Sequence, residues 1–248
     1  MKEVISMWRN TRMVVLTAVC AAVYAAILIP FKIATIIPGF TEIRPAAALP
    51  VIFSLMFGPA GAWGSAFGNL IGDFFGTLGP GSFFGFIGNF LYGFIPYKIW
   101  QYISKQDPIF KTPIASLNYF CCTVLAASAC GIFIAWGIDL LGLIPMEILA
   151  NIITLNNFIV SAILGPFLLV VLYVRVKKWR LLYTDILRNE ELLTRRKFAS
   201  IGILCILLGS IGGILVINLA NFGFIQLSIN WMTMLPAVLL IIIGAILI

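Results

Sequence analysis

Residues 64–76 read GSAFGNLIGDFFG, a segment with a glycine at every fourth position and mostly apolar residues between them. This spacing places Gly64, Gly68, Gly72 and Gly76 along one face of a helix. Glycine weakens helices in water, but membrane helices associate through close van der Waals contact, which small side chains permit. The stretch therefore predicts a helix that packs closely against a neighbour inside a membrane.

The composition supports a membrane environment for the whole chain. Apolar residues make up 62% of the 248 and charged residues 10%, with a mean hydropathy of +1.10. Soluble domains are about half apolar and about a quarter charged. Several stretches exceed the roughly 20 apolar residues that cross a bilayer core. The chain is therefore expected to be an all-α polytopic membrane protein.

Glycine, proline and charged residues divide the apolar sequence into eight candidate spans. We expect a six-span bundle in residues 1–176, a basic cytoplasmic linker in 177–198 that forms an amphipathic helix at the lipid surface, and a two-span C-terminal extension in 199–248. The eight spans cover residues 12–31, 44–58, 60–78, 82–103, 114–138, 147–174, 199–220 and 229–248. The segment KIATIIPGFTEIR, residues 32–44, follows the first span and is expected to be irregular.

Charge asymmetry predicts the orientation. Every Lys and Arg except Lys32 and Arg44 falls on the side of the N-terminus. Such an excess of basic residues marks the cytoplasmic side, so both termini are expected in the cytoplasm. It also accounts for the net charge of +7 without a nucleic-acid partner. The opposite side carries the acidic residues Glu42, Asp73, Asp139 and Glu147.

The sequence lacks the residues and motifs that metal binding, redox chemistry and ATP hydrolysis commonly require. Histidine is absent, and the five cysteines lie inside apolar runs without metal-ligand or redox spacing. No phosphate-binding GxxxxGK[ST] loop is present, so the chain cannot drive transport with ATP by that route. We therefore expect neither catalytic residues nor a metal site.

The glycines of the third and fourth spans predict a helix pair. Gly81, Gly85 and Gly88 begin the fourth span, and a short loop separates them from the glycines of the third. The two spans are expected to pack against each other along these faces. The residues predicted to mediate helix packing are Gly64, Gly68, Gly72, Gly76 and Gly85.

Asn69 and Asp73 lie on one face of the third span, beside the glycines. A carboxylate inside a membrane is costly and normally faces a partner or a water-filled cavity. One interpretation is a ligand site, and the other is a structural hydrogen-bonded pair or a helix-end residue.

Other polar residues of the first six spans gather toward the non-cytoplasmic side, among many aromatic residues. Apolar walls with a few amides and one or two charges are typical of a small-molecule pocket, and they favour a planar heteroaromatic or vitamin-like ligand over a bare ion. The substrate-binding candidates are Glu42, Arg44, Asn69, Asp73, Asn89, Tyr92, Asn151 and Asn156.

Three motifs together resemble a known family. The first span contains TAVCAAVYAA, whose Ala18, Ala22 and Ala26 form a smooth stripe, and TEIRPAAALPVIFSLMFGPAGAWGSAFGNLIGD and GFIGNFLYGFIPYKIW follow. Over roughly residues 10–176 the chain resembles the substrate-binding S components of energy-coupling factor (ECF) transporters, in particular the broad riboflavin-type group. The two extra C-terminal spans depart from the family pattern.

The resemblance implies a six-helix bundle in a prokaryotic plasma membrane that binds one micronutrient from outside. Ala18, Ala22 and Ala26 would dock on a transmembrane T component, and two cytoplasmic ATPase subunits would use ATP, with no covalent cofactor on this chain. Residues 36–44 would form a lid, and the bundle would topple to release its cargo. A riboflavin-like compound, another vitamin, a queuosine precursor or a cobamide remain open as cargo. The missing histidine argues against cobalt or nickel.

The principal alternative is a stand-alone secondary transporter coupled to an ion gradient, with Asp73 as the coupling carboxylate. That interpretation predicts inverted repeats, and no convincing repeat relates the two halves of the chain. A membrane scaffold without a ligand pocket is a third alternative, which the cluster of amides disfavours.

Overall fold

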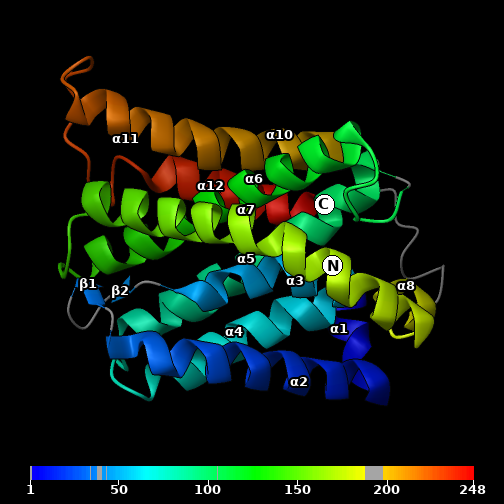
Figure 1. Cartoon of the computed structure of the whole chain (residues 1–248). Helices are drawn as coiled ribbons and strands as arrows, with labels where there is room; N and C mark the ends of the chain where they lie inside the picture. The colour runs from blue at the N-terminus through cyan, green and yellow to red at the C-terminus, as the bar shows by residue number, and fades with distance from the viewer. Residues whose placement is uncertain (1, 34, 38–40, 43, 105, 188–197) are drawn as a thin grey trace.

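The computed structural model describes residues 2–33, 35–37, 41–42, 44–104, 106–187 and 198–248, and Figure 1 shows their arrangement. Helical segments occur at all eight predicted spans, and four helices within the described residues are long and apolar enough to cross a membrane. The prediction of an all-α polytopic membrane protein is confirmed. The first six spans are α2 (Thr11–Leu28), α3 (Ala48–Phe57), α4 (Pro59–Asp73), α5 (Gly81–Ile103), α6 (Pro113–Leu140) and α7 (Met146–Lys178).

The helices stack in layers across the bundle. In Figure 1, α2 and α4 lie on one side, α3 and α5 in the middle, and α6 and α7 beyond them. We call the end that carries the turns after α4 and α6 the hairpin end, because a small β-hairpin lies there. The opposite end, where α7 finishes, is called the basic end.

The β-hairpin corrects the expectation of an irregular segment after the first span. Strand β1 (Thr35–Ile37) pairs antiparallel with β2 (Thr41–Glu42), with Thr35 opposite Glu42. The β-branched residues of β1 favour extended backbone, and the sequence between the strands contains a Pro-Gly turn signal. The predicted lid, residues 36–44, therefore includes β2 and part of β1, and residues 38–40 and 43 lie outside the described residues.

Helix α4 packs against α5, as the sequence predicted, but its glycine stripe lies against α2. A Cβ on Gly68 would lie 2.7 Å from Tyr24 Cβ and 2.9 Å from the Ala21 carbonyl oxygen. At Gly64 and Gly72 the nearest α2 side-chain atoms, those of Cys20 and Leu28, would lie even closer to such a Cβ. Spacing shows that a face is smooth but does not identify the helix that covers it, which explains the wrong partner. Gly76 is not a packing residue, because it lies in a turn with φ +135° and nothing within 4 Å of its Cβ position.

Helix α3 is too short to cross a bilayer. Its ten residues rise about 15 Å, against a hydrocarbon core of about 30 Å, and all ten are buried. A 3-10 turn, η3 (Pro45–Ala47), leads into it. The helix ends at Gly58, whose φ of +54° breaks the helical path, and Pro59 starts α4. The second predicted span is thus an interior helix covered by its neighbours.

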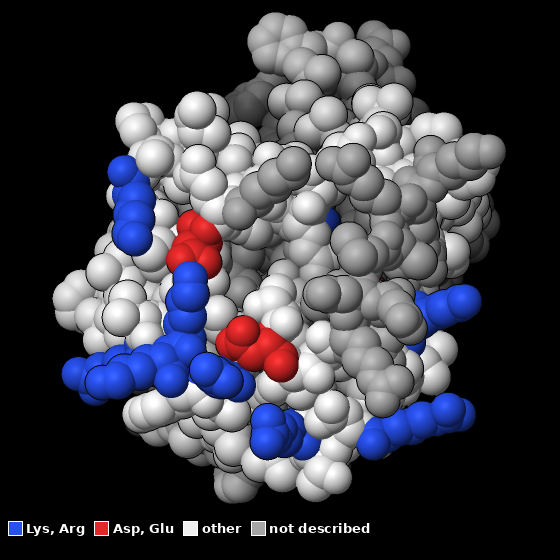
Figure 2. Space-filling model, turned by 90° about the vertical axis from the view of Figure 1, so that its right-hand side faces the viewer, with Lys and Arg blue, Asp and Glu red and all other residues white. Residues whose placement is uncertain are grey.

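A buried ion pair joins the N-terminus to the bundle at the basic end. Glu3, in the short helix α1 (Lys2–Ser6), lies 2.6 Å from Lys98 of α5, and both side chains are less than a tenth exposed. Burial alone would raise the pKa of the Glu3 carboxyl, but the attraction and hydrogen bond of Lys98 hold it below its usual value. The remaining Lys and Arg side chains visible in Figure 2 lie around the rim of this end.

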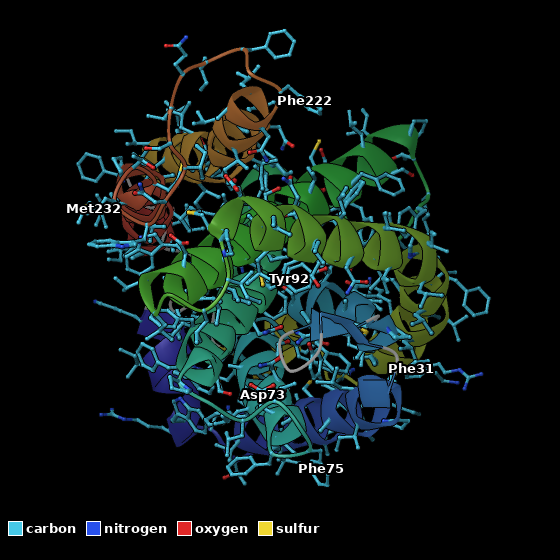
Figure 3. All side chains as sticks on the ribbon, turned by 90° about the vertical axis from the view of Figure 1, so that its left-hand side faces the viewer. Phe31, Asp73, Phe75, Tyr92, Phe222 and Met232 are labelled. Atoms are coloured by element: carbon cyan, nitrogen blue, oxygen red, sulfur yellow. The ribbon has the colours of Figure 1, made fainter. Side chains whose placement is uncertain are left out.

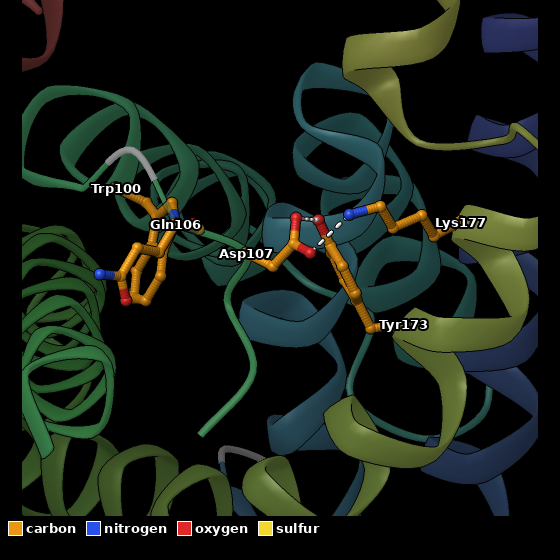
Figure 4. A network of polar contacts seen from close by, with 5 residues as sticks. All are labelled: Trp100, Gln106, Asp107, Tyr173 and Lys177. Atoms are coloured by element: carbon orange, nitrogen blue, oxygen red, sulfur yellow. Dashed lines mark hydrogen bonds and ion pairs between the residues drawn. The ribbon is translucent and has the colours of Figure 1, made fainter. Parts of the chain in front are cut away.

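A second polar network closes the basic end around the loop between α5 and α6 (Figure 4). Asp107 accepts a hydrogen bond from the Tyr173 hydroxyl at 3.0 Å and pairs with Lys177 at 2.5 Å. Trp100 donates from its indole nitrogen to the Gln106 carbonyl oxygen at 3.0 Å. These contacts tie the loop to the last turns of α7.

The predicted linker is not one continuous amphipathic helix in its described part. Helix α7 continues to Lys178, and the chain then turns at Arg180, whose φ is +54°. A single helical turn follows, α8 (Tyr183–Ile186). Residues 188–197 lie outside the described residues. The positive φ interrupts the helical periodicity that the sequence suggested.

The C-terminal extension packs on the outside of α6 and α7 (Figure 1). Its first span is α10 (Ala199–Leu207), a π-helical turn η4 (Leu208–Gly212) and α11 (Gly213–Asn221), and its second is α12 (Leu235–Leu247). Ile206, Ile217 and Ile241 of the extension are fully buried. The extension is thus an integral layer of the fold.

Candidate ligand cavity at the hairpin end

A cavity of about 300 Å³ opens at the hairpin end between α4, α5, α6 and α7. Figure 3 views this end, with Asp73 labelled below Tyr92 and with Phe31 and Phe75 nearer the edge of the molecule. The polar lining consists of Arg44, Asn69, Asp73, Thr77 and Ser82. The apolar lining includes Ile134, Ile138, Leu143, Leu149 and Ile153.

A chain of hydrogen bonds orders the polar side of the cavity. The Arg44 guanidinium donates to Asn69 Oδ1 at 3.3 Å, and Asn69 Nδ2 donates to Asp73 Oδ2 at 3.3 Å. Thr77 donates from its hydroxyl to Asp73 Oδ1 at 3.0 Å. Asn69 is 2% exposed and Asp73 5%. The sequence prediction that Asn69 and Asp73 share a face is confirmed. The two residues form a hydrogen-bonded pair at the end of α4 and also line the cavity, and the interpretation as a ligand site stays a prediction.

Gly85 of α5 keeps space open opposite this pair. A Cβ at that position would lie 3.1 Å from Asn69 Nδ2 and 3.7 Å from Asp73 Oδ2. Gly85 also lines the cavity. It therefore makes room for polar side chains and a ligand more than it mediates helix packing.

The apolar wall is set by close contact between α5 and α6. The Ile138 side chain fills the place of a missing side chain at Gly81, and the Ile134 side chain does the same at Gly88. These two isoleucines are four residues apart and so project from one face of α6. The width of the cavity depends on where this end of α6 lies.

Two further candidates lie deeper in the bundle than the cavity lining. Asn89 accepts a hydrogen bond from the Tyr24 hydroxyl at 3.2 Å and donates to the Gly85 carbonyl oxygen. The Tyr92 hydroxyl donates to the Asn157 carbonyl oxygen at 2.9 Å and lies 2.6 Å from Ser161 Oγ. In this structure both residues hold helices together and neither lines the cavity.

Two of the remaining candidates, Asn151 and Asn156, lie outside the cavity lining. Asn151 faces the C-terminal extension and accepts a hydrogen bond from Asn218 at 2.9 Å. Asn156 is half-buried and does not line the cavity. For Glu42 the structure describes the backbone, in β2, and its side chain lies outside the description.

Sequence reasoning missed the turn that closes one side of the cavity. Residues 76–82, GTLGPGS, all contribute to the lining. Thr77 follows Asp73 by four residues, the same spacing that pointed to Asn69, and this signal could have identified it. The apolar lining residues carried no signal that separated them from other core positions.

The polar and apolar groups of the cavity are of the kinds that bind small molecules. One carboxylate, one guanidinium and one amide meet apolar walls, as in small-molecule sites with few fixed polar groups. Among the described residues, no group of three or more His, Cys, Asp or Glu side chains could hold a metal ion.

A second hollow, of about 330 Å³, lies at the basic end beside Asp107, Trp100 and Tyr183. Burial alone would raise the pKa of the Asp107 carboxyl, but its bonds to Lys177 and Tyr173 hold it below the usual value. Both carboxylate oxygens of Asp107 are engaged in these contacts. The lining of this hollow has Asp107 as its charged residue, whereas the hairpin-end cavity combines a carboxylate, Asp73, with a guanidinium, Arg44.

Comparison with known proteins gives one match. The sequence model of the family described as "QueT transporter" matches residues 14–174, which include the described cavity lining. The match covers the region on which the resemblance to S components was based, and that recognition is confirmed. It ends before the C-terminal extension. No curated protein and no solved structure matches the chain.

Proposed function

Because the chain belongs to the QueT transporter family, we propose that it is the substrate-binding S component of an ECF-type importer. Its cargo is a small, planar, purine-like heterocycle, with a queuosine precursor favoured among the cargoes that the sequence left open. The single observation that carries the proposal is the cavity ordered by Arg44, Asn69 and Asp73.

The polar chain suits a heterocycle with adjacent donors and acceptors. A carboxylate can accept two neighbouring N–H groups of a guanine-like edge, and an amide can donate and accept. The isoleucines of α6 supply an apolar surface for a flat ring. A volume of about 300 Å³ lies at the lower end of the range for ligand pockets. It favours a single base over a cargo as large as a cobamide.

Charge supports an orientation with the cavity facing outward. Arg9, Arg12, Arg175 and Lys178 belong to the basic end, and the acidic Asp73 belongs to the hairpin end. Basic residues are enriched on the cytoplasmic side of membrane proteins. The N-terminus would then be cytoplasmic and the cavity would receive its cargo from outside.

The alanine stripe of α2 supports docking on a T component. Ala18, Ala22 and Ala26 are exposed, while the opposite face of the helix, with Tyr24, packs on α4. A smooth exposed face lets a partner helix approach closely. In this proposal two ATPase subunits bound to the T component supply the energy.

Ligand identification tests the cargo directly. The purified protein is analysed by mass spectrometry for small molecules that co-purify, and binding of a 7-deazaguanine base is measured beside riboflavin. Asn69→Ala removes the amide that joins Arg44 to Asp73. Loss of its hydrogen bonds should cost about 1.4 kcal/mol or more of binding free energy, which lowers the affinity at least about tenfold. Asn118→Ala, a half-buried amide toward the basic end of α6, is the matched control. Equal affinity of both variants would refute the assignment of the cavity.

A second experiment tests docking. Ala22→Trp should leave ligand binding intact but abolish ATP-driven uptake with the T component and ATPases, because the bulky ring prevents close helix contact. Val170→Trp, on an exposed position of α7, should retain uptake. Normal uptake by Ala22→Trp would count against docking at the stripe.

The buried Asp73 carboxylate also supports the alternative of an ion-coupled transporter. Proteoliposomes that contain this chain alone distinguish the two functions. Under the S-component proposal they do not concentrate the base when a proton or sodium gradient is applied. Accumulation driven by either gradient would establish the alternative.

A further inference from the structure

The C-terminal extension is fastened to the last turn of α6 by both backbone polar groups of one residue. The Trp231 N–H donates to Asp139 Oδ2 at 2.7 Å. The Trp231 carbonyl oxygen accepts from the indole nitrogen of Trp136 at 2.9 Å. Trp231 belongs to the connection between α11 and α12, which Figure 1 shows at the hairpin end.

The cavity wall lies on another face of the same helical turns. Ile134 and Ile138 line the cavity, and Trp136 and Asp139 alternate with them along α6. Each isoleucine packs directly against a glycine of α5, so this end of α6 cannot move closer to α5. On its other side the position of the helix is fixed by the bonds to Trp231.

The second apolar wall has the same construction. Leu149 and Ile153 of α7 line the cavity, and Asn151 between them accepts a hydrogen bond from Asn218 of α11 at 2.9 Å. The apolar side of the site is formed by α6 and α7. The extension contacts both helices through residues that do not line the cavity.

We propose that the C-terminal extension is a brace for the ligand cavity, and that Asp139, Trp136 and Asn151 are positioning residues that act through the α6 and α7 walls. This inference rests on the proposed function, since it assigns ligand binding to the same cavity. The brace lies beyond residues 14–174, the part of the chain that the family shares. The proposal thus gives the C-terminal extension a role within this subunit.

Removing the contact at the hairpin end tests the brace. Asp139→Ala should weaken binding of the 7-deazaguanine base about three- to tenfold through faster dissociation, because the wall loses a fixed position. Asp139→Asn keeps an oxygen acceptor for the Trp231 N–H and should bind within about twofold of wild type. An affinity of Asp139→Ala equal to wild type would overturn the proposal.

A matched control lies at the other end of the same extension. The Tyr102 hydroxyl contacts Ser200 Oγ at 2.5 Å, far from the cavity. Tyr102→Phe also removes a polar contact between the extension and the bundle, but it should leave the affinity unchanged. A similar loss of affinity in both variants would indicate general destabilisation and refute a specific brace.

Hydrogen exchange provides a readout that needs no ligand. Asp139→Ala should increase backbone exchange in residues 134–143, whereas Asp139→Asn and Tyr102→Phe should not. If the wild-type protein binds no base, the proposed function fails, and this exchange measurement alone decides the brace. Unchanged exchange in Asp139→Ala would overturn it.

Discussion

Gly68→Ala tests the close approach of α2 and α4 on which the fold depends. The new Cβ would lie 2.7 Å from Tyr24 Cβ and 2.9 Å from the Ala21 carbonyl oxygen. Carbon atoms pack best at about 3.5–4.0 Å, so the helices must separate by about 1 Å. Neither contact can be relieved by a side-chain rotation, because one atom is backbone and the other is a Cβ.

The expected loss follows from two opposing effects. Overpacking of a tight contact costs about 1–3 kcal/mol, and this site falls toward the upper end because a whole helix must move. Alanine regains up to about 1 kcal/mol of helix propensity over glycine. The net loss is about 1–2 kcal/mol, which lowers the melting temperature by about 2–8 °C for a chain of this size.

Thermal unfolding in detergent micelles, followed by circular dichroism or a thiol-reactive dye, measures this change. Gly212→Ala is the control, since Gly212 is a helical glycine with nothing within 4 Å of its Cβ position, and it should be neutral or stabilising. Gly68→Val should cost more than Gly68→Ala. A melting temperature for Gly68→Ala at or above that of wild type would refute the close-packing argument.

Three other predictions concern charge and cavity size. Lys98→Met should destabilise the protein by about 3–5 kcal/mol, because it leaves Glu3 buried without its partner; adding Glu3→Gln should recover much of the loss in a double-mutant cycle of unfolding experiments. Asp107 has a folded-state pKa below its ordinary 3.8, so its contribution to stability is complete at neutral pH and is lost as the pH falls through the folded pKa. The melting-temperature difference between wild type and Asp107→Asn should therefore be full at neutral pH, begin to shrink as the pH falls below about 3.8 and disappear only below the folded-state pKa, and a difference that grows on acidification would contradict the assignment. Gly85→Ala should weaken ligand binding by about tenfold, because its methyl group lies 3.1 Å from Asn69 Nδ2; isothermal titration calorimetry would show an unchanged affinity if the cavity is not the site.

The positions of the helices were predictable because apolar length and Gly-Pro punctuation act locally. The Gly58-Pro59 pair marks the end of α3 and the start of α4, as observed. The short length of α3 was not predictable. An apolar run in the sequence looks the same whether lipid or other helices cover it.

Helix partners could not be read from spacing. The glycines of α4 show a smooth face, but two smooth faces were available for it, on the first and the fourth span. Tyr24 and Ala21 provide the contact through their backbone and Cβ atoms, which no sequence pattern displays. The hairpin was missed for a related reason, since two short strands leave too few residues for a period to be seen.

The polar half of the cavity was predictable and the apolar half was not. Asn69 and Asp73 stand out because buried polar groups in a membrane need a reason. Asn89 and Tyr92 satisfied the same criterion, yet their hydrogen bonds join helices. Polar residues in a span therefore identify a network, and only coordinates separate the members that meet a ligand from those that hold the network together.

Because of the close contact between them, α2 and α4 should move together as one rigid unit. Tyr24 and Leu28 occupy the places of absent side chains on α4, so neither helix can slide along the other without opening the interface. Asn69 and Asp73 are carried by α4 itself. A force that a partner exerts on the exposed face of α2 therefore reaches these two side chains through rigid backbone, over the full length of the pair, without being absorbed by side-chain rotation.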